Sequence, residues 1–346
     1  MERSQAPRIL ITRLSAIGDC VLTLPVACAL RRQFPDAMLA WVVEPAGAQL
    51  LRGHPCIDEL IIIDKRWYKS PSVIWDLRRR LRSYQFDIAL DPQSLSKSSL
   101  LGWLSGAARR IGFSPPFGRE LAPWLNNEPV TRTNSHVVPG NLQLLAPLGV
   151  TSPDVQFRLT AEPAAEAKID GWLEQAGISS GFALLNIGAS CDARRWPEER
   201  FGALATLIER RRGLRSVVAW AGQERAAAER AVAASAGNAI LAPDTNLQEL
   251  VAISQRAKLF VGSDTGPLHI AVAVGTQCVG IYGVTNPAVS GPYGARHRIV
   301  TGPEIEWPDA LKQPFGKGRS DDNGIMRMIP ATSVALACDE LSSAAA

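Results

Sequence analysis

An aspartate stands where a short apolar run ends near the start of the chain. Residues 9–12 are rich in strand formers, and a loop of small and polar residues follows them before a stretch of helical length begins. Asp19 lies at this transition from loop to helix. Its carboxylate can cap the helix by accepting a backbone N–H, which contributes about 1 kcal/mol. Alternatively, it can act as a general base that takes a proton from an acceptor hydroxyl.

A second candidate site lies in residues 261–269, where an apolar run ends and a helix of small residues begins. Free N–H groups and the dipole at a helix start attract phosphate oxygens, and Gly266 lets the backbone come close. Thr265 lies beside it. Asp264 repels phosphate, so it either hydrogen-bonds sugar hydroxyls or caps the helix. His269, one turn later, is either part of the same site or a buried core histidine. The pattern predicts a diphosphate site.

A third loop, residues 186–199, carries two adjacent cations. Arg194 and Arg195 precede Trp196, Pro197 and a helix whose first turn is acidic. A pair of cations on a loop after a strand can neutralise a departing diphosphate. The second and third candidate sites therefore both favour a donor that carries a diphosphate.

Regularly spaced apolar runs predict the elements that position these loops. The runs are separated by segments of helical length, and they occupy residues 9–12, 39–43, 59–63, 88–90, 182–186, 216–220, 239–241, 258–261 and 278–282. Such alternation is typical of a parallel sheet wound by helices, and here it occurs twice. We predict an α/β protein with two doubly wound, Rossmann-like domains, whose functional loops leave the carboxyl ends of the strands.

The domain boundaries follow from where the alternation lapses. We predict an N-terminal acceptor-binding domain over residues 1–162, a C-terminal donor-binding domain over 163–330, and a C-terminal helix and tail over 331–346. Residues 134–148 are expected to form one helix. Residues 307–323 are rich in Pro, Gly, Lys and Asp and are expected to form a loop.

Composition excludes several classes of protein. The 346 residues are 46% hydrophobic and 20% charged, as in ordinary globular proteins. No apolar run has the roughly 20 residues that a membrane-spanning helix needs, and the start has no signal-peptide core, so we expect a cytoplasmic protein. The six cysteines form no C-x-x-C pair and lie near no histidine cluster. This spacing argues against a zinc site and a disulfide framework, and we expect neither metal nor cofactor.

Charge is unevenly divided along the chain. Residues 1–160 hold 19 Lys and Arg against 13 Asp and Glu, whereas the remainder holds 18 against 20. The excess in the first half suits an anionic partner, either an acidic sugar or a phospholipid surface, although ordinary surface charge is an alternative. Nucleic acid is disfavoured, because the sequence has neither interleaved basic and aromatic stripes nor a reader motif.

Seven short motifs occur in collinear order. They are residues 13–19 (RLSAIGD), 41–44 (WVVE), 91–98 (DPQSLSKS), 195–197 (RWP), 263–269 (SDTGPLH), 281–287 (IYGVTNP) and 291–294 (GPYG). Together they resemble glycosyltransferase family 9, the ADP-heptose:lipopolysaccharide heptosyltransferases, and most of all its heptosyltransferase I branch. The resemblance implies a GT-B fold of two facing domains with an interdomain cleft. It also implies an ADP-L-glycero-D-manno-heptose donor, and inversion at the anomeric carbon without a metal.

The resemblance also implies roles for individual residues. Asp19 matches the proposed catalytic base, Asp264 the residue that holds heptose hydroxyls, and Glu224 the carboxylate that binds the adenosine ribose. The remaining donor residues are Ser190, Arg194, Thr265, Gly266 and His269, and the acceptor residues are Gly18, Arg66, Lys69, Gln93, Lys97 and Arg119.

The chain departs from the family pattern at the donor. Arg194 stands where relatives usually carry lysine, and a guanidinium binds phosphate differently from an ammonium. Ala189 and Ser190 stand where the nearest relatives have two threonines, so one hydroxyl is lost. Donor affinity or the heptose itself is therefore expected to differ.

The resemblance implies an acceptor of the Kdo–lipid A type, reached in peripheral contact with the cytoplasmic face of the inner membrane. Two other functions remain open from the residues alone. A sugar-nucleotide 2-epimerase would use the same architecture without a separate acceptor, and a non-catalytic sugar-nucleotide-binding protein would not need Asp19.

Overall fold

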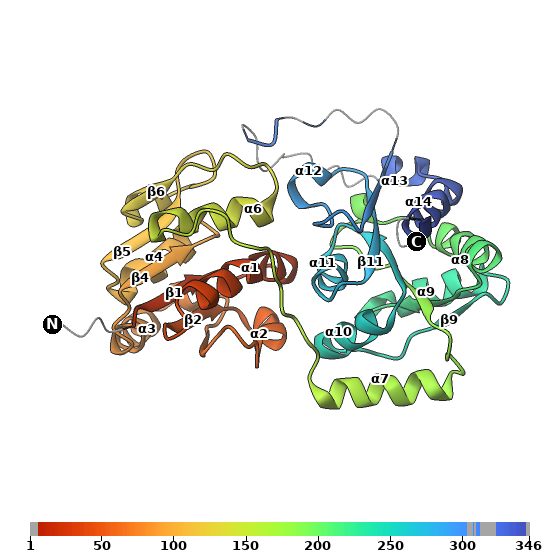
Figure 1. Ribbon diagram of the computed structural model, residues 1–346, viewed down its shortest axis with the longest axis horizontal. Helices are drawn as coiled ribbons and strands as arrows, with labels where there is room; N and C mark the ends of the chain where they lie inside the picture. The colour runs from red at the N-terminus through yellow and green to blue at the C-terminus, as the bar shows by residue number, and fades with distance from the viewer. Residues whose placement is uncertain (1–5, 303–306, 308, 312–322, 344–346) are drawn as a thin grey trace. The chain divides into compact units, whose positions relative to one another are not determined.

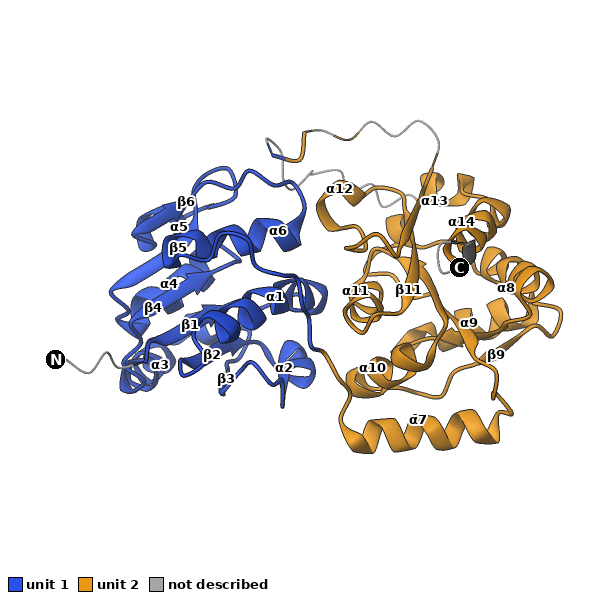
Figure 2. Ribbon diagram, viewed as in Figure 1, with its two compact units in different colours: residues 1–158, 311–314 blue, residues 159–310, 315–346 orange. Residues whose placement is uncertain are grey.

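The computed structural model describes residues 6–302, 307, 309–311 and 323–343, and the chain divides into two units (Figures 1 and 2). Unit 1 holds the residues up to Arg158, together with a short stretch that begins at Leu311. Unit 2 begins at Leu159 and includes the C-terminal helices. Most of the predicted loop over residues 307–323 lies outside the described residues.

Unit 1 is built on a parallel sheet of six strands in the order β3-β2-β1-β4-β5-β6. The strands are β1 (Arg8–Thr12), β2 (Met38–Val43), β3 (Glu59–Ile62), β4 (Ile88–Asp91), β5 (Arg109–Phe113) and β6 (Glu128–Val130). Ile9 of β1 pairs with Leu39 of β2 on one side and Ile88 of β4 on the other. The strand order reverses between β1 and β4, so the loops after these two strands diverge and leave room for a ligand.

Helices cover both faces of this sheet (Figure 1). They are α1 (Ile17–Gln33), α2 (Pro45–Leu51), η1 (Trp67–Lys69), α3 (Pro71–Ser83), α4 (Ser96–Ser105), α5 (Ala122–Leu125), α6 (Val137–Leu142) and η2 (Gln143–Leu148), where η marks a 3-10 turn. The prediction of one helix over residues 134–148 is wrong in detail. The α-helix begins only at Val137 and continues from Gln143 as a 3-10 turn that contains Pro147, which has no N–H to donate.

Unit 2 repeats the topology, with the sheet order β12-β11-β10-β7-β8-β9, all parallel. Its strands are β7 (Phe182–Asn186), β8 (Arg215–Ala219), β9 (Ala239–Leu241), β10 (Leu259–Ser263), β11 (Gln277–Tyr282) and β12 (Arg298–Thr301). Counted from β7, the order is the same as in unit 1, so the reversal falls between β7 and β10.

The helices of unit 2 are α7 (Pro163–Gln175), η3 (Asp192–Arg194), α8 (Glu198–Arg212), η4 (Gly222–Glu224), α9 (Arg225–Ala233), α10 (Leu247–Arg256), α11 (Gly266–Ala273), α12 (Pro287–Ser290), α13 (Gly324–Met328) and α14 (Ala331–Ser343). The C-terminal helix α14 packs on α8, where Arg211 donates to the Asp339 carboxylate at 2.8 Å. The nine predicted strands are confirmed, and β5, β6 and β12 were not predicted.

A buried polar network fixes the loop after β4. Asp91, at the end of that strand, accepts hydrogen bonds from the Ser94 amide at 2.8 Å, the Ser99 hydroxyl and the Asn126 amide group at 3.3 Å. Burial raises the pKa of Asp91, while these hydrogen bonds oppose the rise. Gly112 of β5 leaves room for the network, since a Cβ there would lie 2.1 Å from Asn126 Nδ2.

We expect Gly112→Ala to lower the free energy of unfolding by about 1–3 kcal/mol, because the added methyl group must displace Asn126. Gly171→Ala is the matched control. A Cβ at Gly171, within α7, meets no atom within 4 Å, and alanine should raise stability by up to about 1 kcal/mol. Chemical denaturation of the wild type and both variants measures these changes in stability. An unchanged denaturation midpoint for Gly112→Ala would show that Asn126 can move aside without loss of stability.

Candidate active site

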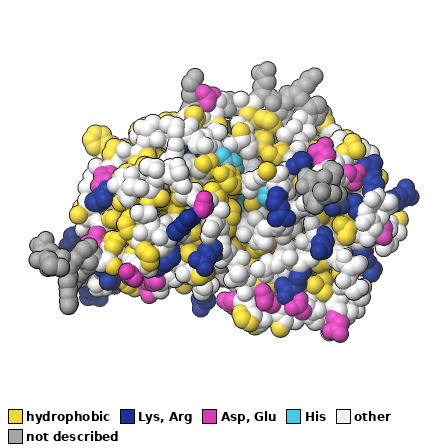
Figure 3. Space-filling view, in the orientation of Figure 1, with side chains coloured by type: hydrophobic (Ala, Val, Ile, Leu, Met, Phe, Trp, Pro, Cys, Tyr) yellow, Lys and Arg dark blue, Asp and Glu magenta, His cyan; other side chains and the backbone are white. Residues whose placement is uncertain are grey.

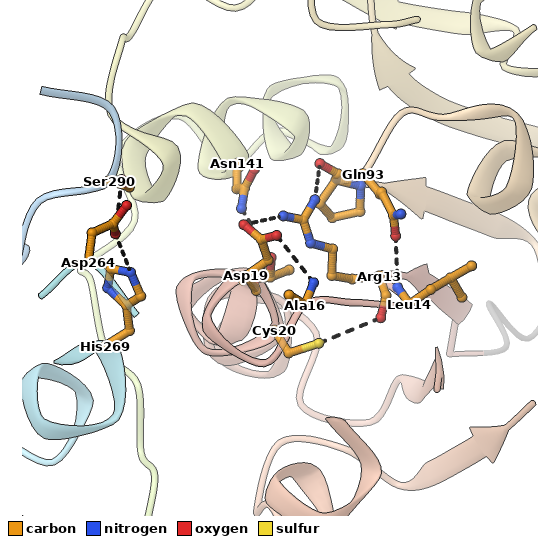
Figure 4. A network of polar contacts seen from close by, with 12 residues as sticks. Arg13, Leu14, Ala16, Asp19, Cys20, Gln93, Asn141, Asp264, His269 and Ser290 are labelled. Carbon is orange, nitrogen blue, oxygen red and sulfur yellow. Dashed lines mark hydrogen bonds and ion pairs between the residues drawn. The ribbon is translucent and has the colours of Figure 1, made fainter. Parts of the chain in front are cut away.

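Asp19 lies in the first turn of α1 with its carboxylate held on both oxygens (Figure 4). Arg13 Nη2 lies 2.7 Å from Oδ1, and the Ala16 amide donates to Oδ2 at 3.2 Å. The side chain remains 42% exposed, so an incoming hydroxyl group can reach it. Asp19 is therefore not the N-cap residue, which is Ala16, although it does satisfy the N-cap amide. The carboxylate can therefore accept the Ala16 amide at the helix start and still present its exposed side to a substrate hydroxyl group.

Arg13, which directly follows β1, was not predicted as a site residue. It is 8% exposed, and its Nη1 donates to the Pro92 carbonyl at 3.1 Å. Its own carbonyl accepts from Trp41 Nε1 at 2.9 Å. In the sequence, its position within the motif of residues 13–19 was the one feature that could have indicated a role in the site. The buried guanidinium fixes the orientation of Asp19.

The loops after β1 and β4 meet at the point where the strand order reverses. Gln93 Oε1 accepts the Leu14 amide at 2.9 Å (Figure 4). Gln93 thus links the loop that leads to Asp19 with the loop that leads to α4. Gly18, the second residue of α1, is half-buried beside Asp19.

The four predicted acceptor cations follow β3, β4 and β5, whose carboxyl ends lie at the same edge of the sheet. Arg66 directly precedes the turn η1 and Lys69 is its last residue, and both side chains are exposed. Lys97 Nζ lies 4.3 Å from the ring centre of Tyr68, within that turn. The Arg119 amide donates to the Ser94 carbonyl at 3.0 Å. One cation–π contact and one backbone hydrogen bond thus connect the three segments that carry these cations.

Arg132, which follows β6, is a second cation that the sequence did not reveal. It is 9% exposed, and it donates to the carbonyls of Asn134 and Ser135 at 2.8 and 2.6 Å. Within the described ranges no carboxylate pairs with it. Burial and the charge of Arg13 lower its pKa to about 10. Arg132 is therefore close enough to Arg13 for the two positive charges to repel each other.

Asp264, which follows β10 in unit 2, also contacts an arginine, but unlike Asp19 it is buried. Its Oδ1 lies 3.4 Å from His269 Nε2 and accepts from the Ser290 hydroxyl at 3.3 Å (Figure 4). Arg194 Nη1 lies 3.3 Å from Oδ2 and also donates to the Asp264 carbonyl at 3.1 Å. Burial alone would raise the pKa of Asp264, but the hydrogen bond and charge of His269 and the charge of Arg194 hold it below its usual range.

Two alternatives are decided by this arrangement. Asp264 does not cap α11, whose N-cap residue is Thr265. His269 is buried and directed at Asp264, so it positions that carboxylate. Arg194 and Asp264 come from the loops after β7 and β10, so they bridge the reversal point of the second sheet as Gln93 bridges that of the first.

The start of α11 offers fewer phosphate donors than the sequence suggested. Pro267 has no N–H, and the amides of Leu268 and His269 both donate to the Thr265 carbonyl, at 3.1 and 3.5 Å. The amides of Thr265 and Gly266 remain, since neither donates to any part of the chain that the structure describes. A diphosphate here needs a cation as well as the helix terminus.

The other predicted donor residues lie on neighbouring loops. Glu224, in η4, accepts the Ala221 amide at 3.1 Å. Its carboxylate borders Gly188, where a Cβ would lie 2.8 Å from Glu224 Oε2. Ser190 is exposed in the same loop after β7 as Gly188. Ser190, Glu224, Arg194 and Asp264 thus occupy the carboxyl edge of one sheet.

The described residues include no group of three His, Cys, Asp or Glu side chains placed to hold a metal ion. Over the same ranges, no helix is long and apolar enough to cross a membrane.

Residues 74–314 match the family model described as "Glycosyltransferase family 9 (heptosyltransferase)". The chain belongs to glycosyltransferase family 9. Among relatives, the lipopolysaccharide heptosyltransferase 1 of Salmonella typhimurium is 27% identical over 307 residues, which are 86% of this chain and 95% of that protein. This family 9 chain is therefore a glycosyltransferase, and membership decides against the epimerase and the non-catalytic alternatives.

Solved structures show the same fold. A family 9 glycosyltransferase from Veillonella parvula superposes with a TM-score of 0.83 at 24% identity, covering 98% of both chains. The Escherichia coli heptosyltransferase WaaC, solved with ADP-2-deoxy-2-fluoro heptose, gives 0.74 at 23% identity and covers 96% of this chain and 99% of its own. The two units are thus the two Rossmann-like domains of a GT-B fold.

The low pKa of Asp264 predicts a specific acid sensitivity of this family 9 enzyme. A carboxyl group whose pKa is depressed by folding stabilises the native state above its usual pKa, and that stabilisation is lost as the pH falls through the folded value. We expect stability to fall more steeply below about pH 4 in the wild type than in Asp264→Asn. Urea denaturation across the acid range measures this.

Asp339→Asn, in the partly exposed pair with Arg211, is the control and should follow the wild-type curve. If the stability of Asp264→Asn and of the wild type fell equally with pH, His269 and Arg194 would not be lowering the pKa of Asp264.

Proposed function

We propose that this enzyme transfers L-glycero-D-manno-heptose from ADP-heptose to an anionic sugar of the lipopolysaccharide inner core, of the Kdo type. The reaction inverts the anomeric carbon and uses no metal. The observation that carries the proposal is the Asp19 carboxylate of a family 9 chain, oriented by Arg13 yet open to an incoming hydroxyl. The location proposed with it is the cytoplasmic face of the inner membrane, where a lipid-linked acceptor would be met.

The chemical step follows from the placement of one base. Asp19 takes the proton of the acceptor hydroxyl as its oxygen attacks the anomeric carbon of heptose. The bond from that carbon to the diphosphate breaks on the opposite face, and its electron pair leaves with ADP. Asp19 is suited to this because Arg13 and the Ala16 amide fix the carboxylate before the acceptor arrives.

For the donor, the proposal assigns Asp264 to heptose hydroxyls, Glu224 to the ribose, and Ser190, Thr265 and Gly266 to the phosphates. Arg194 supplies the cation that the start of α11 lacks. Both of its contacts with Asp264 use Nη1, which leaves the rest of the guanidinium fork for the diphosphate. The donor analogue bound in the similar WaaC structure supports an ADP-heptose donor.

For the acceptor, the proposal adds Arg132 to Gly18, Arg66, Lys69, Gln93, Lys97 and Arg119. Arg13 pairs with Asp19, whereas Arg132 pairs with no carboxylate among the described residues, so an anion of the acceptor would be its counter-ion. The carboxylate of a Kdo-type sugar would supply it, next to the hydroxyl that Asp19 deprotonates. Arg132 would then select acidic acceptors.

We expect the purified protein to add one heptose to a soluble Kdo-containing acceptor in the presence of ADP-heptose, as detected by mass spectrometry. Asp19→Asn should lower kcat at least about a hundredfold, the scale of a lost general base. An asparagine oxygen can still accept the Ala16 amide, so the helix cap and the donor KM should survive.

Asp339→Asn, remote in sequence on α14, serves as the matched control and should keep the wild-type rate. A near-normal kcat for Asp19→Asn would leave Asp19 with the capping role alone. Absence of product from every acidic acceptor would reject the proposed reaction.

Neutralising an acceptor cation should affect one substrate only. We expect Arg132→Gln and Lys97→Gln each to raise the KM of the soluble acceptor about tenfold or more, because a charge-assisted hydrogen bond contributes about 1.5–3 kcal/mol. The donor KM should stay nearly constant. Arg52→Gln, an exposed arginine after α2, should change neither. Equal shifts in both KM values would mean that these cations only support the fold.

A further inference from the structure

Exposed apolar side chains are concentrated on unit 1. Of the ten large apolar residues that are exposed in the described part of the chain, seven lie between Ile62 and Trp124. Trp75 is 67% exposed, Leu121 61% and Trp124 86%. Trp103 is half-exposed. Isolated exposed apolar residues need no explanation, but three exposed tryptophans on neighbouring helices do.

These residues lie on helices that contact one another. Arg78 of α3 lies 5.4 Å from the ring centre of Trp103 on α4, so α3 and α4 meet at this surface. Ser96 and Trp103 are seven residues apart on α4 and share one face of that helix. The Ser96 hydroxyl accepts the Leu121 amide, at the start of α5, at 3.1 Å. The face of α4 thus connects Trp75 and Trp103 to Leu121 and Trp124.

The same region is strongly basic. Helix α3 carries four arginines against one acidic residue, Asp76, and it is amphipathic, with Leu77 and Leu81 buried beneath. Figure 3 shows basic and apolar side chains exposed beside one another over unit 1 on the face drawn. We call Trp75, Arg78, Arg79, Arg80, Trp103, Leu121 and Trp124 the tryptophan–arginine surface.

We propose that the tryptophan–arginine surface docks unit 1 onto an anionic lipid bilayer. Tryptophan prefers the boundary between headgroups and acyl chains, and arginine is attracted to anionic headgroups. Its place is consistent with the proposed function, on which the inference rests, because Leu121 lies two residues from Arg119 and Ser96 is adjacent to Lys97. A lipid-linked acceptor would lie next to the docked surface with its sugar at the acceptor cations.

The test uses vesicles without substrate, so it is independent of transfer activity. We expect the full chain to float with vesicles of phosphatidylcholine and phosphatidylglycerol, to bind pure phosphatidylcholine far less, and to be released by salt. Tryptophan fluorescence should shift to shorter wavelength on binding.

Single substitutions identify the surface. We expect Trp124→Ala to lower the partition coefficient about tenfold, from the apolar area it withdraws, and Arg79→Gln about fivefold. The matched controls are Leu336→Ala and Arg210→Gln, exposed residues of unit 2, which should stay within about twofold of the wild type. Transfer to a soluble acceptor should be unchanged in Trp124→Ala.

Several results would overturn the proposal. The first is that the protein does not float with anionic vesicles, and the second is that Trp124→Ala and Arg79→Gln float as well as the wild type. The third is that the wild type sediments as a dimer and Trp124→Ala as a monomer, which would mean that a second copy of the chain covers this surface. Binding without any heptose transfer would instead refute the proposed reaction and leave the docking surface standing.

Discussion

In each unit an arginine pairs with a carboxylate beside the point where the strand order reverses, and this contact ties together the two loops that flank the reversal. Arg13 fixes Asp19 and is itself tied to the Pro92 carbonyl of the neighbouring loop. Arg194 spans the equivalent gap in unit 2 to reach Asp264. Because the two sheets share one strand order, the same constraint acts twice. Each arginine joins the two loops that diverge at the reversal, and the other candidate residues lie on these and neighbouring segments at the same edge of each sheet.

The two pairs differ in exposure, and this difference separates their roles. The Asp264 side chain is 8% exposed and contacts a buried histidine as well as the arginine. Such a group holds fixed geometry and is poorly placed to exchange protons with an incoming substrate. Asp19 keeps 42% of its side chain exposed, and among the described residues its carboxylate contacts Arg13 and the Ala16 amide. The difference in exposure thus suits Asp264 to a positioning role and Asp19 to contact with a substrate.

The sequence predicted the strands best where both faces are buried. The run that forms β1 is apolar throughout, as parallel strands covered by helices must be. Strand β5 was missed because it begins with Arg109 and Arg110 and contains Gly112, and β12 because it is only half-buried. Asp19 and Asp264 could be proposed as site residues because they lie in segments that follow apolar runs. Arg132 could not, since its neighbour Arg13 is 119 positions away in the sequence and only the fold brings the two charges together.

The charges around Arg13 bear on which acceptor the proposed reaction would use. Arg13 pairs with Asp19, whereas Arg132 donates to the backbone carbonyls of Asn134 and Ser135 and pairs with no carboxylate in the described part of the chain. A buried charge without a counter-ion is costly, and a charge-assisted hydrogen bond to an anion offsets that cost. Under the proposed function, the acid group of the acceptor would bind Arg132 while its hydroxyl group faces Asp19. A neutral sugar would leave Arg132 without a counter-ion, even if it fitted the site. The same contact would thus favour acidic acceptors and position the hydroxyl group for attack.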